Sequence, residues 1–152
     1  MDASALYLEM RESPGRGRGV FAKAPIPSRA TINVSPVLVF PAAQYEAHGR
    51  HTELAHYAFV WRDAAPPSMA LALGLGSIFN HCSAPNVGWL ADVEARVIRY
   101  VALRAIEPGE ECFIDYGPAL WFEDSGGAAG GRPASPASEP DAEAFLGALA
   151  TD

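Results

Sequence analysis

The residue types best suited to chemistry gather in one polar segment between two apolar ones, residues 80–86, with the sequence Asn-His-Cys-Ser-Ala-Pro-Asn. The segment follows Ile78 and Phe79 and runs directly into the apolar residues 87–90. Amide, imidazole and thiol groups at such a place need hydrogen-bond partners, because a buried polar group left unsatisfied costs about 1–3 kcal/mol. A turn rich in asparagine could supply those partners by itself, and a ligand with its own donors and acceptors could supply them too.

A glycine-rich segment nearer the N-terminus, residues 17–22, has the sequence Gly-Arg-Gly-Val-Phe-Ala and fits the dinucleotide-binding pattern G-x-G-x-x-A. That pattern binds a pyrophosphate only where it opens a helix. Here Pro25 and Pro27 follow at once, so no long helix can begin, which argues against a Rossmann fold. Two interpretations remain: a turn whose glycines let the backbone approach a ligand closely, or a plain hairpin turn.

Tyr116 stands in a third candidate segment, residues 109–117, where it follows a short strand at the edge of a turn. Considered alone, a tyrosine in that position is usually a packing residue. His48, His51 and His56 lie close together but have no adjacent cysteine or fourth ligand, so their spacing favours surface histidines over a metal site.

Short strands must position these segments. The chain of 152 residues has 13 prolines and 14 glycines, many at the ends of short apolar runs, which predicts strands and turns rather than a helical bundle. Its length suits one domain with a core. Residues 42–54 are the best helical stretch, weakened at Gly49. The predicted strands are residues 5–10, 20–22, 31–40 (two short strands or one bent at Pro36), 55–61, 87–90, 96–103 and 112–114.

The net charge of −7 is uneven, because −5 of it falls on residues 119–152. An acidic chain is a poor candidate for gripping a phosphate backbone, so no direct binding of nucleic acid is expected. The acidity could attract a basic peptide or serve solubility alone. No apolar run approaches the roughly 18 residues that span a bilayer, and residues 1–5 do not resemble a signal peptide. Two cysteines form no disulfide framework, so we expect a soluble, intracellular protein with free thiols.

The C-terminal region differs from the rest in composition. Residues 125–140 are rich in Gly, Ala, Pro and Ser and cannot bury a core, so they are predicted to be disordered. A short helix over residues 141–149 would carry its apolar side chains on one face. The domain is therefore expected to span residues 1–124, with an acidic tail over residues 125–152.

In their order along residues 5–122, these segments together resemble the SET-domain family of protein lysine methyltransferases. Residues 17–22 are similar to the family's opening G-x-G-V-x-A turn, and residues 77–82 (Ser-Ile-Phe-Asn-His-Cys) to its central F-x-N-H-[SC] motif. Residues 85–86 (Pro-Asn) resemble the following P-N, and residues 106–117 the closing I-x-x-G-E-E and [DN]-Y-G. Each match is weak alone, but four matches in the family's order and at compatible spacings make the resemblance specific.

The resemblance implies a mainly β fold, with short curved sheets in a β-clip-like arrangement and a C-terminal pseudoknot, in which the closing segment passes beneath a loop. A short helical insert would span about residues 41–70. Cofactor and substrate would enter from opposite faces and meet in a narrow channel. The chain shows no cysteine-rich segment before or after the motifs, so the zinc-binding segment that often closes the channel is not expected. Leu120, Trp121 and Phe122 could close it instead.

The implied activity is methyl transfer from S-adenosylmethionine to a lysine side chain of a protein, histone or not, with S-adenosylhomocysteine as product and no metal. The partner would be a basic, lysine-containing protein or peptide. An alternative is a catalytically degenerate SET module that binds a peptide or protein without turnover. Asn80, His81 and Tyr116 favour the enzyme, because all three stand where the family motifs have them.

The resemblance also implies roles for single residues. Asn80 would hold the amino group of the cofactor, and the His81 backbone would read its adenine edge. Tyr116 would be the tyrosine at the point of methyl transfer. The residues implied to bind the cofactor are Arg18, Gly19, Asn80, His81, Tyr116 and Trp121.

Tyr57 is similar to the family's channel-lining tyrosine and joins Tyr116 as an implied catalytic residue. Phe79 and Ile114 complete the implied substrate channel. Ile114 stands two residues before Tyr116, where the family often has a tyrosine whose hydroxyl limits the number of methyl groups added. Because isoleucine has no hydroxyl, di- or trimethylation is expected if Ile114 lines the channel. The alternative is that Ile114 only faces the core.

Overall fold

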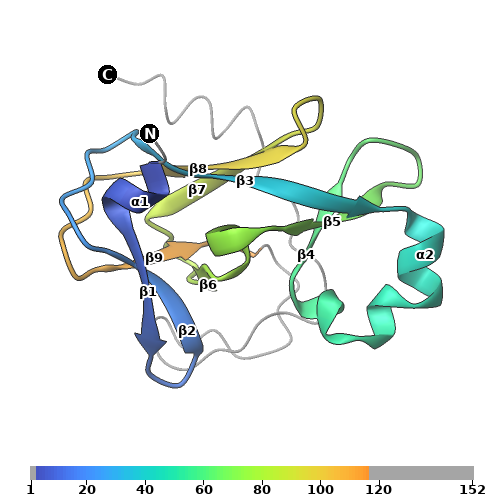
Figure 1. Ribbon diagram of the computed structural model, residues 1–152, viewed down its shortest axis with the longest axis horizontal. Coiled ribbons are helices and arrows are strands. Elements are labelled where there is room, and N and C mark those ends of the chain that lie inside the picture. The colour runs from blue at the N-terminus through green and yellow to red at the C-terminus, as the bar shows by residue number, and fades with distance from the viewer. Residues whose placement is uncertain (1–2, 117–152) are drawn as a thin grey trace.

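The computed structural model describes residues 3–116, which form two sheets and several short helices (Figure 1). One sheet has the strand order β1-β2-β9-β6 and the other β4-β5-β3-β8-β7, so the expected mainly β fold class is confirmed. No helix within residues 3–116 is long and apolar enough to cross a membrane. In chain order the elements are α1 (Ala3–Tyr7), β1 (Leu8–Ser13), β2 (Gly17–Ala22), β3 (Thr31–Phe40), α2 (Ala42–Ala47), the 3-10 helices η1 (Gly49–His51) and η2 (Glu53–His56), β4 (Ala58–Trp61), β5 (Ser68–Ala72), the 3-10 helix η3 (Gly74–Ser77), β6 (Asn80–His81), β7 (Val87–Asp92), β8 (Val97–Ala102) and β9 (Glu111–Ile114).

A hairpin of β1 and β2 carries the glycine-rich turn. The two strands pair antiparallel, and Gly15 (φ 72°) and Gly17 (φ 75°) adopt the left-handed backbone conformation that favours glycine. No helix follows the turn before Thr31, in agreement with the argument against a Rossmann fold. β9 pairs antiparallel with β2 and parallel with β6, so this short closing strand lies between the hairpin and the polar segment.

The long strand β3 pairs with β5 over its second half and with β8 over its first. Pro36 does not divide it, because this residue pairs with Val97 of β8 and its carbonyl accepts from the Leu73 N–H at 2.9 Å. Of the two possibilities left open by the sequence, one continuous strand is correct. The irregularity lies elsewhere, as a register shift between Thr31 and Asn33.

The first predicted strand is wrong at its start, because residues 5–7 belong to α1 and β1 begins at Leu8. The Ser4 hydroxyl donates to the side-chain carbonyl of Asn33 at 2.6 Å, and both side chains are buried. This bond ties the helix to β3. The local alternation of apolar residues favoured a strand here. A hydrogen bond between residues 29 positions apart cannot be recognised from such a local pattern.

The helix predicted over residues 42–54 exists only in part. α2 covers its first half, and η1 and η2 follow. Gly49 marks the break: a Cβ there would come 2.9 Å from the Tyr45 ring, so the chain packs against that ring too closely for a larger residue. The Thr52 hydroxyl then caps η2 by accepting a backbone N–H at 3.2 Å. As a result, η2 takes the first residues of the strand predicted over residues 55–61, and β4 is shorter than expected.

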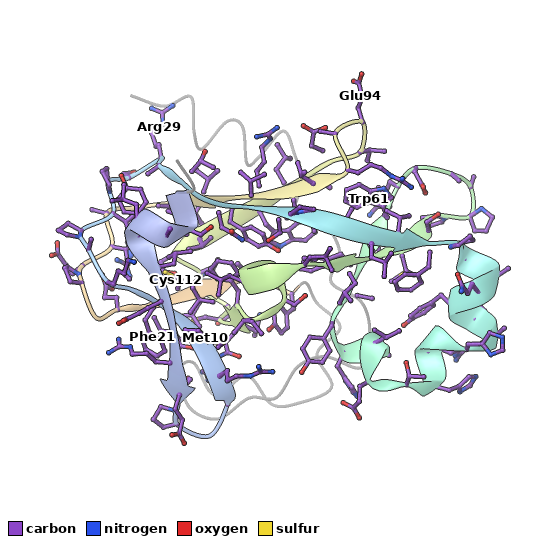
Figure 2. All side chains as sticks on the ribbon, viewed as in Figure 1. Met10, Phe21, Arg29, Trp61, Glu94 and Cys112 are labelled. Carbon is purple, nitrogen blue, oxygen red and sulfur yellow. The ribbon has the colours of Figure 1, made fainter. Side chains whose placement is uncertain are left out.

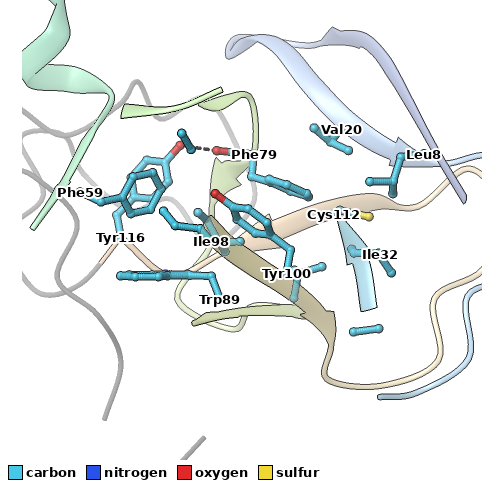
Figure 3. Close-up of a cluster of buried hydrophobic side chains, with 14 of the residues drawn as sticks. Leu8, Val20, Ile32, Phe59, Phe79, Trp89, Ile98, Tyr100, Cys112 and Tyr116 are labelled. Carbon is cyan, nitrogen blue, oxygen red and sulfur yellow. Dashed lines mark hydrogen bonds between the residues drawn. The ribbon is translucent and has the colours of Figure 1, made fainter. Parts of the chain in front are cut away.

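Both sheets contribute to one core that is rich in aromatic side chains (Figure 3). Phe79 and Tyr100 stack with their ring centroids 4.6 Å apart, and Phe59 and Trp89 meet edge to face at 5.0 Å. The Tyr100 hydroxyl donates to a backbone carbonyl at 2.9 Å, so its polar atom is satisfied inside the core. Tyr116 belongs to the same cluster. The implied transfer-site tyrosine therefore follows the end of β9 in the chain, but its side chain is packed in the core.

The two thiols lie in different surroundings. Both cysteines are free; Cys82 is half-buried, whereas Cys112 is fully buried in β9 (Figure 2). Burial first, and then the nearby carboxylates of Glu110 and Glu111, raise the pKa of the Cys112 thiol to about 12. Since the thiolate is the nucleophile, Cys112 should be unreactive near neutral pH.

We therefore predict that iodoacetamide at pH 8 modifies Cys82 in the folded protein and reaches Cys112 only after unfolding. Peptide mass spectrometry at intervals of the reaction measures both sites, and the same experiment in denaturant is the control. Equal labelling of the two cysteines in the folded protein would contradict the buried position of Cys112.

Candidate active site

Three segments that are distant in the sequence line one cavity of about 520 Å³. They are the β1–β2 turn, η2 with the residue after it, and β6 with Ile78 before it. Of the residues implied by the family resemblance, Arg18, Tyr57 and Asn80 meet here. The lining residues are Arg16, Gly17, Arg18, Glu53, His56, Tyr57, Ile78 and Asn80.

The Asn80 amide has a fixed orientation. Its Nδ2 donates to the Arg18 carbonyl at 3.1 Å and to Glu111 Oε1 at 2.7 Å. A carbonyl and a carboxylate only accept hydrogen bonds, so the nitrogen of the amide must face them. With both N–H groups used, Oδ1 is the polar atom left for a ligand. It is an acceptor, and it suits a donor such as an ammonium group.

Glu111 connects this amide to the first hairpin. Its second oxygen, Oε2, accepts from the Ser13 hydroxyl at 2.8 Å. Gly19 lies directly against the same carboxylate: a Cβ at Gly19 would overlap Glu111 Oε1 and come 3.0 Å from Asn80 Nδ2. Close packing therefore requires the second glycine of the turn.

His81 contacts Tyr116, the implied transfer-site tyrosine, through its side chain. Its Nδ1 accepts from the Tyr116 backbone N–H at 3.1 Å, and the two rings lie 5.3 Å apart. The His81 carbonyl, part of the backbone implied to read adenine, accepts from Arg16 at 3.3 Å. The imidazole is thus directed into the core, and His81 itself does not line the cavity.

Tyr116 is buried just beyond the end of β9. Its hydroxyl donates to the Phe79 carbonyl at 2.5 Å, the dashed line in Figure 3. Because the hydroxyl proton is held by this carbonyl, the oxygen presents its lone pairs to any further partner. The tyrosine is therefore arranged as a hydrogen-bond acceptor.

Of the other implied channel residues, only Tyr57 lines the cavity. Phe79 and Ile114 have no exposed surface and belong to the main core, so the structure does not place them on the wall of the cavity. Tyr57 is half-buried and lines both this cavity and a second, apolar groove of about 680 Å³, where Leu54 and Leu73 are its neighbours. Tyr57 thus stands where two depressions meet. Trp121 and the rest of the implied lid lie outside the described residues.

Three residues of the cavity were not proposed for the site from the sequence: Arg16, Glu53 and His56. The guanidinium of Arg16 lies 4.9 Å above the Phe113 ring, and its Nε is buried without a hydrogen-bond partner among the described residues. Its place next to the G-x-G turn was the available signal. His56 was expected at the surface but is half-buried, because η2 turns it towards the hairpin.

Asn80 can be tested against a matched residue, Asn86. Both are buried, and the Asn86 amide also bridges β9, by donating to the Glu111 carbonyl at 2.9 Å and accepting from the Phe113 N–H at 2.8 Å. We predict that Asn80→Ala and Asn86→Ala each lower the free energy of unfolding by about 1–3 kcal/mol. Asn80→Ala should weaken binding of S-adenosylmethionine by about 10-fold or more, and by more than Asn86→Ala does, since it alone removes a hydrogen bond to a charged group. Thermal melts and calorimetric titration measure both effects. Equal affinities in the two folded variants would show that Asn80 does not hold the cofactor.

Comparison with known proteins agrees with this geometry. A sequence profile described as SET domain matches residues 17–117. The chain is 48% identical over 122 residues to a Schizosaccharomyces pombe protein named histone-lysine N-methyltransferase, H3 lysine-37 specific, and the match covers 80% of this chain and 81% of that protein. A Plasmodium falciparum candidate histone methyltransferase has a similar fold, with a TM-score of 0.59 at 23% identity over 76% of this chain and 96% of that chain. The profile covers most of the described residues, and the chain therefore belongs to the SET-domain family.

Proposed function

We propose that this SET-domain enzyme transfers methyl groups from S-adenosylmethionine to a lysine of histone H3, and that lysine 37 is the first site to examine. The observation that carries the proposal is the 48% identity to a relative named for that site, over four fifths of both chains. The cavity formed by the G-x-G turn, Tyr57 and Asn80 supports an active enzyme. No feature of the described residues favours the alternative of a peptide-binding module without turnover.

The residues of the cavity fit the cofactor. The Asn80 amide offers an acceptor at the cavity that suits an ammonium group, and Gly17, next to Arg18, faces open space there. We propose that the Arg18 and Gly19 backbone, the Asn80 amide and the His81 backbone hold S-adenosylmethionine. When bound, this cofactor supplies a methyl group on a sulfonium, which is open to in-line displacement.

Tyr116 would orient the lysine amine rather than take its proton. Its own proton is donated to the Phe79 carbonyl, so its oxygen can accept an N–H of the amine and point the nitrogen lone pair along the line of attack. The amine must be neutral. A free lysine with a pKa of about 10.4 lies roughly 3 units above pH 7.4, which corresponds to about 4 kcal/mol. The apolar side chains around Tyr116 lower that cost, because burial disfavours the ammonium form.

The charge of the chain suits a basic substrate. The net charge is −7, of which residues 119–152 carry −5, whereas the cavity itself is lined by Arg16 and Arg18 as well as the exposed Glu53. A lysine-rich segment such as a histone tail would be attracted to the overall negative charge of the chain rather than to the cavity walls, and the attraction would weaken with salt. The SET domain over residues 1–124, the tail over residues 125–152 and the lid role of Trp121 remain predictions.

The direct test is incubation with labelled S-adenosylmethionine and recombinant histone H3, with and without arginine in place of lysine 37. We predict that H3 is labelled and that the substitution removes most of the label. Tyr116→Phe should fold and lose methyl transfer by about 10²–10⁴-fold, because it lacks the oxygen that positions the amine. If H3 is labelled equally with and without the substitution, the methylated lysine is not lysine 37. A Tyr116→Phe variant whose rate of methyl transfer is within threefold of the parent's would refute the role of Tyr116.

The number of methyl groups depends on the surroundings of position 114. Ile114 is fully buried in the main core and does not line the cavity, so it bears on the product only if the lysine channel extends to the Tyr116 side of the core; it brings no hydroxyl that could hold a water or the methylated amine. Without that restraint the amine can rotate and be attacked again. We predict that the parent enzyme reaches the di- or trimethylated state when a substrate peptide is taken to completion. Mass spectrometry distinguishes the products, and a reaction that stops at one methyl group would contradict this role of Ile114.

A further inference from the structure

The peptide unit between Asp115 and Tyr116 is held on both sides by side chains. Its carbonyl, on Asp115, accepts from the Trp89 indole Nε1–H at 3.1 Å. Its N–H, on Tyr116, donates to His81 Nδ1 at 3.1 Å. β9 has already ended at Ile114, so the pairing of strands does not reach this unit. An indole from β7 and an imidazole from β6 take the place of neighbouring strands.

Trp89 is well suited to fix the position of the Asp115 carbonyl, because it is itself held in place. It is 1% exposed, its ring meets Phe59 edge to face at 5.0 Å, and its strand β7 pairs with β8 along its whole length. Figure 3 shows Trp89 and Tyr116 within the same group of core side chains. An indole fixed in this way holds the Asp115 carbonyl at a set distance from the second sheet.

His81 is equally constrained, and its hydrogen bonding defines its protonation. Its side chain is 3% exposed and its backbone pairs with Ile114. Nδ1 can accept the Tyr116 N–H only if it carries no proton, so the neutral ring has its proton on Nε2. The Asp115 carboxylate, 3.6 Å from Nδ1, faces an acceptor in this form and cannot replace the peptide N–H.

We infer that Trp89 and His81 form a clamp on the Asp115–Tyr116 peptide unit, and that both act as positioning residues for the Tyr116 hydroxyl. This inference rests on the proposed function only for the catalytic role of Tyr116. The hydroxyl is held at its far end by the Phe79 carbonyl, so the clamp and this bond together fix both ends of the tyrosine. A shift of the clamped peptide unit moves the oxygen that orients the amine, whereas the Asn80 amide and the G-x-G turn keep their own partners. Methyl transfer is then affected through kcat and not through the affinity for the cofactor.

Trp61 supplies a matched control for Trp89. It is also 1% exposed and belongs to the same core cluster, but it lies in β4, and among the described residues it has no hydrogen bond to Asp115 or Tyr116. Trp89→Phe and Trp61→Phe remove the same atoms from the same core, so both should lower the melting temperature. If Trp89 only fills space, the two variants will also behave alike in catalysis.

The kinetic experiment compares these two variants with the full-length parent by steady-state methylation of the accepted substrate. We expect Trp89→Phe to lower kcat by about 10- to 100-fold, as a small misplacement of a positioned group does, with KM for S-adenosylmethionine within twofold. Trp61→Phe should keep kcat within threefold of the parent. Equal loss of kcat in both variants, or a loss in Trp89→Phe that lies only in KM, would overturn the inference.

A second measurement does not depend on turnover. Amide hydrogen exchange followed by NMR reports the Tyr116 N–H directly, in His81→Asn and His81→Leu. Asparagine places an oxygen acceptor near the position of Nδ1, and leucine places none. We expect the Tyr116 amide to exchange faster in His81→Leu and to regain protection in His81→Asn. Unchanged protection in His81→Leu would overturn the clamp even if the enzyme proved active, and loss of protection would support it even if histone H3 proved not to be the substrate.

Discussion

The site depends on one short strand, β9, being held from two sides. Its four residues lie between β2 and β6, and the Asn86 side chain bridges it through the Glu111 carbonyl and the Phe113 N–H. From this strand the Glu111 carboxylate orients the Asn80 amide, and the chain that leaves it carries Tyr116. A displacement of β9 would therefore disturb Asn80, on the proposed cofactor side, and Tyr116, on the proposed transfer side, together.

Polar bonds at the site act on top of packing that would be hard to rearrange. The Tyr116 ring lies in the cluster that also contains Phe79 and Trp89, and a cluster of this density does not deform gradually. The core restricts where the ring of Tyr116 can lie, and the hydrogen bonds at its peptide unit and its hydroxyl then fix the direction of the side chain. This division explains how a hydroxyl can be placed accurately at the end of a four-residue strand.

Sequence reasoning recovered the fold class, and three of the residues it proposed for the site, Arg18, Tyr57 and Asn80, line one cavity. Arg18 and Asn80 were found because they stand in motifs with fixed order. It also found where the insert helix weakens, since Gly49 is a poor helix former. The family resemblance contributed the functional meaning, which periodicity alone could not provide.

The misses share a physical cause, which is that they depend on contacts between distant segments. α1 was taken for a strand because the Ser4–Asn33 bond is invisible in a local window. Trp89 looks like any core residue of a strand until the position of Asp115 is known. His56 lies at the cavity because it is the last residue of η2. The Thr52 hydroxyl caps the start of this helix by accepting a backbone N–H.

The bond between Ser13 and Glu111 joins residues 98 positions apart, and this distance affects how the protein is made. Contacts of such long range are formed late, because the entropy of closing the intervening loop must be overcome first. On the ribosome, the turn and Asn80 emerge well before the carboxylate that orients them. A chain that ends before Glu111 contains every residue that lines the cavity but lacks the carboxylate that orients the Asn80 amide, so the cavity is completed only after Glu111 has been added.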